Sequence, residues 1–279
     1  MNPLAAYLRK PEIYVKLPSR GKWWPDDAID MPVNNEFPVM AMNGHNDITM
    51  RNADGLMNGA SSVEVIQSCV PNIKNAWAGP TMDIEYLFVA LRIASYGSEM
   101  DMEKVCSKCK ESTKFGINLQ YVLESMNFPD FEIPIELGDL YIMLKPASFY
   151  LTNLTAQELF EQQRAIMATA SSELTLGQKE KILKESITQL SKITVSKLVE
   201  YIDYVMMPDG TKVNNPEHIQ EFINEVNRKD FNLLKKGIDN MNNQYAAPDL
   251  PFKCSNTECN HEETFRFEFN PSNFFAADS

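Results

Sequence analysis

The sequence has few of the residues, and none of the short motifs, from which most enzyme active sites are built. It contains only three histidines, His45, His218 and His261, in 279 residues. A glycine-rich phosphate loop, a G-x-S-x-G turn and an H-E-x-x-H helix are all missing. We therefore predict a protein that is not an enzyme and has no small-molecule substrate.

Positive charge and long apolar runs are also scarce. Lys and Arg number 26 against 38 Asp and Glu, which gives a net charge of −12. Because binding to nucleic acid or anionic lipid depends on clustered cations, we expect neither as a partner. The best apolar run, residues 86–94, is interrupted by Arg92 and is too short to span a membrane. The first ten residues lack a secretory leader, so we expect the protein to stay in a reducing compartment.

Five cysteines are present, and four of them form two close pairs, Cys106 with Cys109 and Cys254 with Cys259. In a reducing compartment such pairs hold a metal or perform redox chemistry more often than they form disulfides. Two thiolates two to four residues apart can bind one tetrahedral metal, and a second pair completes a closed site. The sequence predicts a structural Zn²⁺ site, with buried free thiols as the alternative. Cys69 lies in an apolar run and is expected to be buried.

The two cysteine pairs share their downstream spacing. Phe115 and Phe265 each follow the second cysteine of their pair by the same distance, at the start of a strand-like run. This indicates two arms of one split zinc ribbon, in which four thiolates leave no open position for catalysis. A redox role for Cys106 and Cys109 is disfavoured because a strand, and not a helix, follows them. We expect His261 to be a solvated surface residue; the alternatives are that it replaces a cysteine as a ligand or donates a hydrogen bond to the site.

Residues 1–60 are rich in Pro, Asn and Gly, and they contain two short strand-like runs at 13–17 and 37–42. Between these runs, Trp23 and Trp24 lie among turn-forming residues. We expect a rigid arm whose rings dock on another surface, and we name Arg20, Trp23 and Trp24 as candidate docking residues. Ordinary core aromatics under a loop are the alternative.

The remaining elements follow from periodicity and turn signals. Helices are predicted over 61–69 and over 82–95, the latter ending at Gly97. A strand is predicted over 114–119, and a hairpin pairs 131–137 with 140–145. Residues 155–242 show no strand pattern and three N-cap candidates, Thr155, Thr175 and Asn215. The further expected elements are helices over 179–193, 198–206 and 222–234, a turn over 207–213, a linker over 240–251 and a strand over 264–269.

These elements predict an α+β protein in three parts. Residues 1–60 form an irregular N-terminal arm with short strands. Residues 61–148 together with 246–279 form an α+β lobe that contains the split zinc-ribbon-like site. Residues 149–245 form an inserted helical bundle lobe, whose two ends the metal would hold close together.

Three stretches resemble a known family. They are KLPSRG at 16–21, SCVPNI at 68–73, and MDIEYLFVALRIASYG at 82–97 leading into the first cysteine pair. They are similar to the baseplate hub and hub-assembly proteins of T-even-like contractile-tailed bacteriophages. The resemblance covers about residues 10–120, and none of its strings is a catalytic signature.

The resemblance implies a non-enzymatic role, as a baseplate hub component or a hub-assembly chaperone. Such a protein would dock on other hub and wedge proteins in the host cytoplasm, and could stay in the virion tail. The alternative is a zinc-ribbon adaptor of transcription or replication that binds nucleic acid or polymerase. It is suggested by the basic residues around the first cysteine pair, which acidic residues near the second pair offset. The basic residues are Lys104, Lys108, Lys110 and Lys114, and the acidic ones are Glu258, Glu262 and Glu263.

Overall fold

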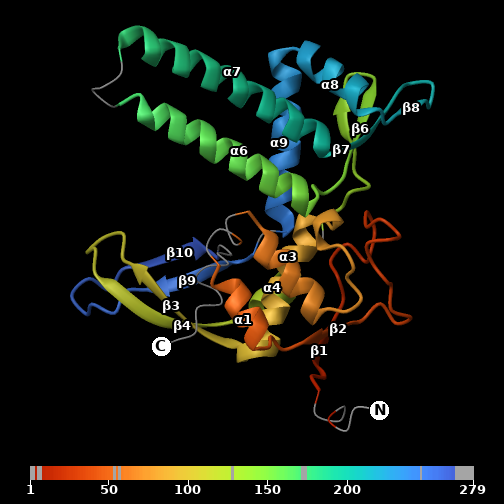
Figure 1. Ribbon diagram of the computed structural model, residues 1–279. Helices are drawn as coiled ribbons and strands as arrows, with labels where there is room; N and C mark the ends of the chain where they lie inside the picture. The colour runs from red at the N-terminus through yellow and green to blue at the C-terminus, as the bar shows by residue number, and fades with distance from the viewer. Residues whose placement is uncertain are drawn as a thin grey trace. The chain divides into compact units, whose positions relative to one another are not determined.

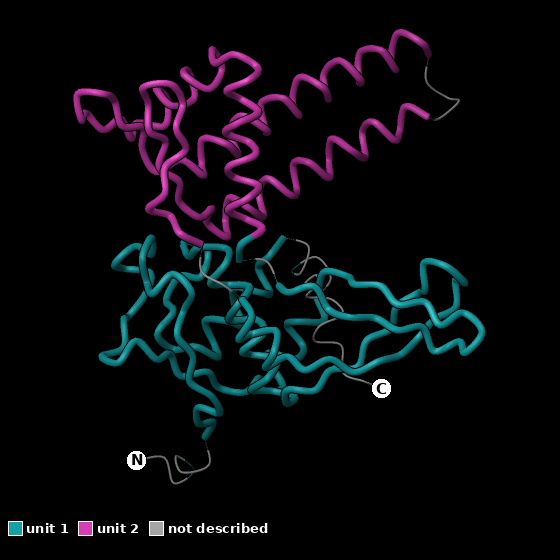
Figure 2. Tube along the Cα trace, turned by 180° about the vertical axis from the view of Figure 1, so that it is seen from behind, with its two compact units in different colours: residues 1–128, 244–279 teal, residues 129–243 magenta. Residues whose placement is uncertain are grey.

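The computed structural model describes residues 4, 8–52, 55, 58–126, 129–170, 175–245 and 247–267. The chain forms two compact units, shown in different colours in Figure 2. Unit 1 comprises residues 1–128 and 244–279, and unit 2 comprises residues 129–243. Unit 1 is therefore built from two stretches of chain that are separated in the sequence by the whole of unit 2.

The N-terminal part of unit 1 packs around one helix, α4 (Thr81–Tyr96). Strands β1 (Pro11–Val15) and β2 (Phe37–Met40) form an antiparallel pair. They contact α4, as do α3 (Ala60–Cys69) and α5 (Leu119–Ser125), while α1 (Gly44–Met50) contacts α3 (Figure 1). A short 3-10 helix, η2 (Ala76–Ala78), contacts α3. Apolar residues occupy most positions of α4, so it is buried on more than one face and forms the centre of this core.

The segment between β1 and β2 is fixed to α4 by one buried carboxylate, that of Asp83. Its Oδ1 accepts a hydrogen bond from the Ser19 backbone N–H at 2.9 Å, and its Oδ2 accepts one from Trp24 Nε1 at 2.6 Å and one from the Ser19 hydroxyl. Burial raises the pKa of Asp83 to about 6, although these hydrogen bonds act to lower it. The Trp24 ring lies against Gly79, where an added Cβ would be 2.2 Å from Cη2. Trp24 is therefore a core residue of unit 1.

The described part of unit 1 also contains two β-hairpins. Strands β3 (Glu99–Val105) and β4 (Ser112–Asn118) pair in the segment that precedes unit 2. Strands β9 (Asp249–Lys253) and β10 (Glu262–Arg266) pair in the segment that follows it. Both pairings are antiparallel and in regular register, and each hairpin turn contains one of the cysteine pairs (Figure 1).

In the part of unit 2 that the structure describes, an antiparallel sheet is combined with helices α6 to α9. The sheet has the order β5 (Ile135–Leu137), β6 (Leu140–Leu144), β7 (Ile202–Met206) and β8 (Lys212–Val213). Helices α6 (Phe149–Ala168) and α7 (Leu176–Glu200) are antiparallel neighbours, and α8 (Pro216–Glu225) contacts α7. Helix α9 (Arg228–Tyr245) packs closely on the sheet, since an added Cβ at Gly237 would be 2.3 Å from Ile135 Cδ1.

The predicted α+β class is confirmed, and so are several of its elements. The two N-terminal strands, the helices over 61–69 and 82–95, and the strand over 114–119 are present. Gly97 ends α4 with a positive φ of 88°, and Gly138 turns the β5–β6 hairpin with a φ of 62°. Thr175 forms a capping box with Gln178 at the start of α7, and Asn215 caps α8. Of the strand predicted over 264–269, residues 268 and 269 lie outside the described residues.

Other predictions for the second half of the chain are wrong. Residues 198–206 are not one helix, because α7 ends at Glu200 and the β-favouring run after it pairs with β6 as β7. Strands β7 and β8 both lie within residues 155–242, where no strand was predicted. Thr155 lies inside α6, whose N-cap is Ser148. The helix predicted over 222–234 is divided at Asn227, whose side chain accepts from the Asp230 backbone N–H.

The linker predicted over 240–251 is also wrong, because α9 continues to Tyr245 and β9 begins at Asp249. Strand β3 had no counterpart among the predictions, since its residues are mostly charged or Met. The division into an arm over 1–60, a lobe over 61–148 with 246–279, and an insertion over 149–245 stays a prediction.

Candidate metal centre

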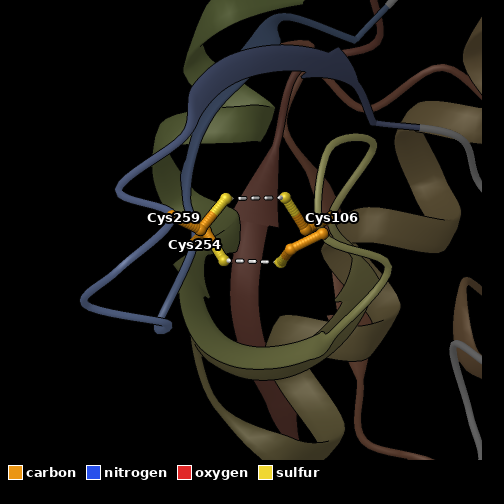
Figure 3. Close-up of side chains that lie close together, drawn as sticks. Cys106, Cys254 and Cys259 are labelled. Carbon is orange, nitrogen blue, oxygen red and sulfur yellow. Dashed lines mark hydrogen bonds between the residues drawn. The ribbon is translucent and has the colours of Figure 1, made fainter.

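The side chains of the two cysteine pairs converge at one point between the hairpin turns. Cys106 and Cys109 lie in the β3–β4 turn, and Cys254 and Cys259 lie in the β9–β10 turn. Figure 3 shows sulfurs from the two turns directed toward one another. The four sulfur atoms all lie within 4.8 Å of one another. We call this group the four-cysteine cluster.

The distances within the four-cysteine cluster suit a shared tetrahedral metal. Cys106 Sγ lies 4.0 Å from Cys259 Sγ, and Cys109 Sγ lies 3.5 Å from Cys254 Sγ. Four sulfurs at about 2.3 Å from one Zn²⁺ in a tetrahedron would lie about 3.8 Å apart, close to these values. Disulfides would require about 2.05 Å, and all five cysteines are free. The donor set and its spacing therefore fit zinc.

The two turns position their cysteines in the same way. The first cysteine of each pair donates its backbone N–H to the carbonyl two residues beyond the second, from Cys106 to Glu111 and from Cys254 to His261, at 2.9 Å in both turns. The residue after the second cysteine has a positive φ, 64° at Lys110 and 43° at Asn260. Each hairpin therefore reverses through a left-handed residue, which directs both of its sulfurs to one side.

The backbone of the first turn favours a thiolate. The backbone N–H groups of Cys109 and Lys108 hold the pKa of the Cys106 thiol down at about 6, against the opposing effect of burial. The thiolate is the form that binds a metal, and the turn favours it at Cys106. The pKa of the Cys109 and Cys254 thiols is instead raised, by burial and by the neighbouring cysteine sulfurs.

An aromatic cluster lies next to the sulfurs and joins the two hairpins. The Phe115 ring packs edge-on against Phe252 and against Phe265, with ring centroids 5.6 Å apart in both pairs. Cys106, Cys254 and Phe252 are buried in the same cluster. The equal spacing of Phe115 and Phe265 from their cysteine pairs places both rings at equivalent positions of the two arms. Phe252, on the strand before the second pair, was missed by the sequence analysis.

Polar contacts also join the two turns. Ser255 donates its backbone N–H to Thr113 Oγ1 at 3.1 Å, and the two hydroxyl oxygens are 3.0 Å apart. Asn256 donates its side-chain N–H to Glu111 at 2.7 Å. These contacts connect residues more than 140 positions apart in the sequence, so no local pattern could have predicted them.

His261 lies beside the four-cysteine cluster without belonging to it. Its Nε2 is 3.1 Å from Ser107 Oγ, and Ser107 donates a hydrogen bond to Glu263 at 2.8 Å. Lys104 Nζ lies 3.3 Å from Glu263 Oε1 and also lies over the Phe252 ring. His261 was expected to be a solvated surface residue, whereas the structure gives it a hydrogen bond that joins the two turns.

The other residues named from the sequence lie elsewhere in unit 1. Cys69 is fully buried at the end of α3, with its Sγ 3.5 Å from Arg9 and from Asn46. Trp24 is buried as described above, Trp23 is half-buried beneath the Lys22 ammonium, and Arg20 is exposed.

Backbone hydrogen bonds from residue 20 to 17, from 22 to 19 and from 24 to 21 make the intervening segment a series of tight turns. The segment predicted to be a rigid arm, residues 17–24, thus consists of consecutive turns. The docking assignment of Arg20, Trp23 and Trp24 stays a prediction.

Three comparisons with known proteins complete the description. The chain matches the family model described as T4 bacteriophage base plate protein over residues 45–276. The matched range includes all of unit 2 and both cysteine pairs. Comparison with curated proteins gave no significant match, and comparison with solved structures gave none. Among the described residues, every helix is too short or too polar to cross a membrane.

Proposed function

This chain belongs to the T4 bacteriophage base plate protein family, and we propose that it serves as a hub component or hub-assembly chaperone of a contractile tail. The observation that carries this proposal is the family match over residues 45–276, which is far more than half of the chain. The sequence resemblance to hub and hub-assembly proteins supports the more specific role.

The proposed role is non-enzymatic and depends on docking. The partners would be other baseplate hub and wedge proteins, met in the host cytoplasm during assembly and retained in the virion tail if the protein is a component. Arg20 and Trp23 are the accessible members of the proposed docking set. Trp24 would act by holding their segment to α4 through its hydrogen bond to Asp83.

Within this role, the four-cysteine cluster would bind one structural Zn²⁺. The ion would supply tetrahedral coordination by four thiolates, which leaves no position open for catalysis. Cys106 and Cys109 would contribute from the segment before unit 2, and Cys254 and Cys259 from the segment after it. The cluster would thus fasten the two segments of unit 1 to each other and contribute folding free energy.

The residues around the cluster give less support to the alternative function, a zinc-ribbon adaptor that binds nucleic acid or polymerase, than to the baseplate role. Of the four lysines around the first cysteine pair, Lys104 is paired with Glu263, and beside the second pair Lys253 is paired with Glu262 at 2.8 Å. Cations already paired with carboxylates contribute little to phosphate binding, because the local charge is balanced. The overall charge of −12 acts in the same direction.

The experiment is to disrupt the gene in a phage that encodes this chain and to separate the assembly products by sedimentation. We expect baseplates to be lost or incomplete, and a tagged full chain supplied in trans to restore them. The tagged chain in purified tails would identify a hub component, whereas its presence in intermediates alone would identify a chaperone. Normal tails in its absence, or a chain that joins no baseplate complex and retards DNA at physiological salt, would overturn the proposal.

A further inference from the structure

Lys104 occupies a position on β3 where the strand pattern predicts an apolar residue. The outward positions of β3 are acidic and exposed, whereas the alternate positions are held by Met100, Met102 and Lys104, which are half-buried. The first two of these face Ile117 and Phe115 on β4. Because alternate side chains of a strand share one face, Lys104 lies on the apolar face of this hairpin. An ammonium group in that place needs partners that compensate its charge.

Three contacts of Lys104 are with the other hairpin. Its Nζ lies 3.3 Å from Glu263 Oε1, 5.5 Å from the centre of the Phe252 ring and 5.3 Å from the centre of the Phe265 ring. A cation over an aromatic face is attracted by the electron density of the ring. One side chain from the segment before unit 2 therefore holds β9 and β10, in the segment after unit 2, at three points.

Glu263 depends on this contact. Its Oε1 is buried and accepts no hydrogen bond from any group in the part of the chain that the structure describes, so the Lys104 ammonium compensates its charge. Its Oε2 accepts a hydrogen bond at 2.8 Å from Ser107, the residue after Cys106, and lies 3.6 Å from His261 Nε2. A buried carboxylate oxygen that loses its compensating charge is costly. Glu263 thus connects both cysteine-bearing turns to Lys104.

These contacts require no metal, and they lie close to the sulfurs. Lys104 is two residues before Cys106, and Glu263 is four residues after Cys259. Both residues belong to strands that pair in regular register, so fixing one strand against the other also fixes the two turns. A site whose ligands are already aligned loses less conformational entropy when the metal binds.

We propose that Lys104 is a positioning residue of the four-cysteine cluster, and that its contacts with Glu263, Phe252 and Phe265 align the two cysteine-bearing turns before any metal binds. This deepens the zinc site proposed above, and it rests on that proposal only for its effect on metal affinity. In the metal-free chain the same alignment brings thiols of the two turns to within 3.5 and 4.0 Å of each other.

The first test measures this alignment in the metal-free, reduced full chain. In a glutathione buffer, two protein thiols and one glutathione disulfide give one protein disulfide and two glutathione thiols, and mass spectrometry of peptides counts the disulfides that join the two turns. The equilibrium gives the effective concentration of one turn at the other. Lys104→Met removes the charge and keeps the apolar stem, and it should lower this concentration about tenfold. The matched control is Lys114→Met, at an exposed position of β4.

Glu263→Gln is the second variant, and it separates alignment from a simple effect of charge on the thiols. Loss of a cation disfavours thiolates and loss of an anion favours them, so charge alone predicts opposite changes in the two variants. Alignment predicts a decrease in both, and a double variant that is little worse than either single one. Circular dichroism verifies that each chain is folded. Opposite changes, additive changes, or changes no larger than in Lys114→Met would overturn the proposal.

The second test titrates the same chains with Zn²⁺ in competition with a chelator. We expect one ion per chain in all of them, with an affinity about tenfold weaker in Lys104→Met and in Glu263→Gln than in the wild type and Lys114→Met. Equal affinity in all of them would overturn the positioning role. A wild type that binds no zinc, but whose disulfides depend on Lys104 as described, would contradict the zinc site and still support alignment by Lys104.

Discussion

At the scale of single residues, the four cysteines of the cluster meet at one point of unit 1. Each supplies one sulfur to a group in which every pair lies within 4.8 Å. Sequence spacing was sufficient to select these four residues and to leave Cys69 aside. It could not select Lys104, Glu263 or Phe252, because their contacts join segments that are distant in the sequence.

Cys254→Ser is expected to remove the metal and to lower thermal stability. A hydroxyl is a poor zinc ligand, and loss of a structural metal is among the changes that cost about 3 kcal/mol or more. Differential scanning calorimetry and metal analysis of the same preparations measure both effects. The matched control is Cys69→Ser, which should retain the metal because Cys69 is not in the cluster. Equal metal content in Cys254→Ser and the wild type would contradict the assignment.

Asp83 gives the protein a predictable response to pH. Its pKa is about 6 in the folded state, against an ordinary value of 3.8, so the folded state retains a proton that the unfolded chain loses. The contribution of Asp83 to stability is therefore complete below about pH 4 and is lost as the pH rises through about 6.

The stability advantage of the wild type over Asp83→Asn should thus shrink by about 2 to 3 kcal/mol between pH 4 and pH 7. Urea unfolding at several pH values measures it, with a matched Asp→Asn substitution at the exposed Asp27 as the control. A stability advantage of the wild type that grows with pH would show that folding lowers the pKa of Asp83 and does not raise it.

At the scale of elements, helices and turns were predicted most reliably where the local sequence signal was strongest. The long apolar period of α4, the glycine turn between β5 and β6, and the capping box of α7 are all present. The two strands that were not predicted, β3 and β7, depend on their pairing partners β4 and β6. The charged and Met-rich sequence of β3 gives only a weak strand signal, whereas β7 has a β-favouring run that was assigned to a helix.

Two substitutions near the start of α6 can distinguish the observed N-cap, Ser148, from the predicted one, Thr155. Ser148 accepts a hydrogen bond from the Leu151 backbone N–H at 3.3 Å, whereas Thr155 lies inside the helix. Ser148→Ala should lower the free energy of unfolding by about 1 kcal/mol, because the cap is lost. Thr155→Ala should cost less, since Ala has the higher helix propensity and no cap is removed. Urea unfolding compares the two, and a larger loss in Thr155→Ala would contradict the observed helix start.

At the scale of the whole molecule, unit 1 consists of two segments that the chain must bring together after making unit 2. The hairpins β3–β4 and β9–β10 meet through aromatic rings, through side-chain hydrogen bonds and through the four-cysteine cluster. A link between residues 145 positions apart restricts the unfolded chain strongly, since the cost of closing a loop grows with its length. A metal at this point would stabilise the fold of unit 1.

The most direct test of this account is the metal content of the full chain, purified under reducing conditions and measured by native mass spectrometry. A structural zinc site in the four-cysteine cluster predicts one zinc ion per 31.8 kDa chain, released when the protein is unfolded in acid. It also predicts that Cys106, Cys109, Cys254 and Cys259 resist alkylation until the zinc is removed. A freshly purified, folded and fully reduced chain that carries no metal would contradict it.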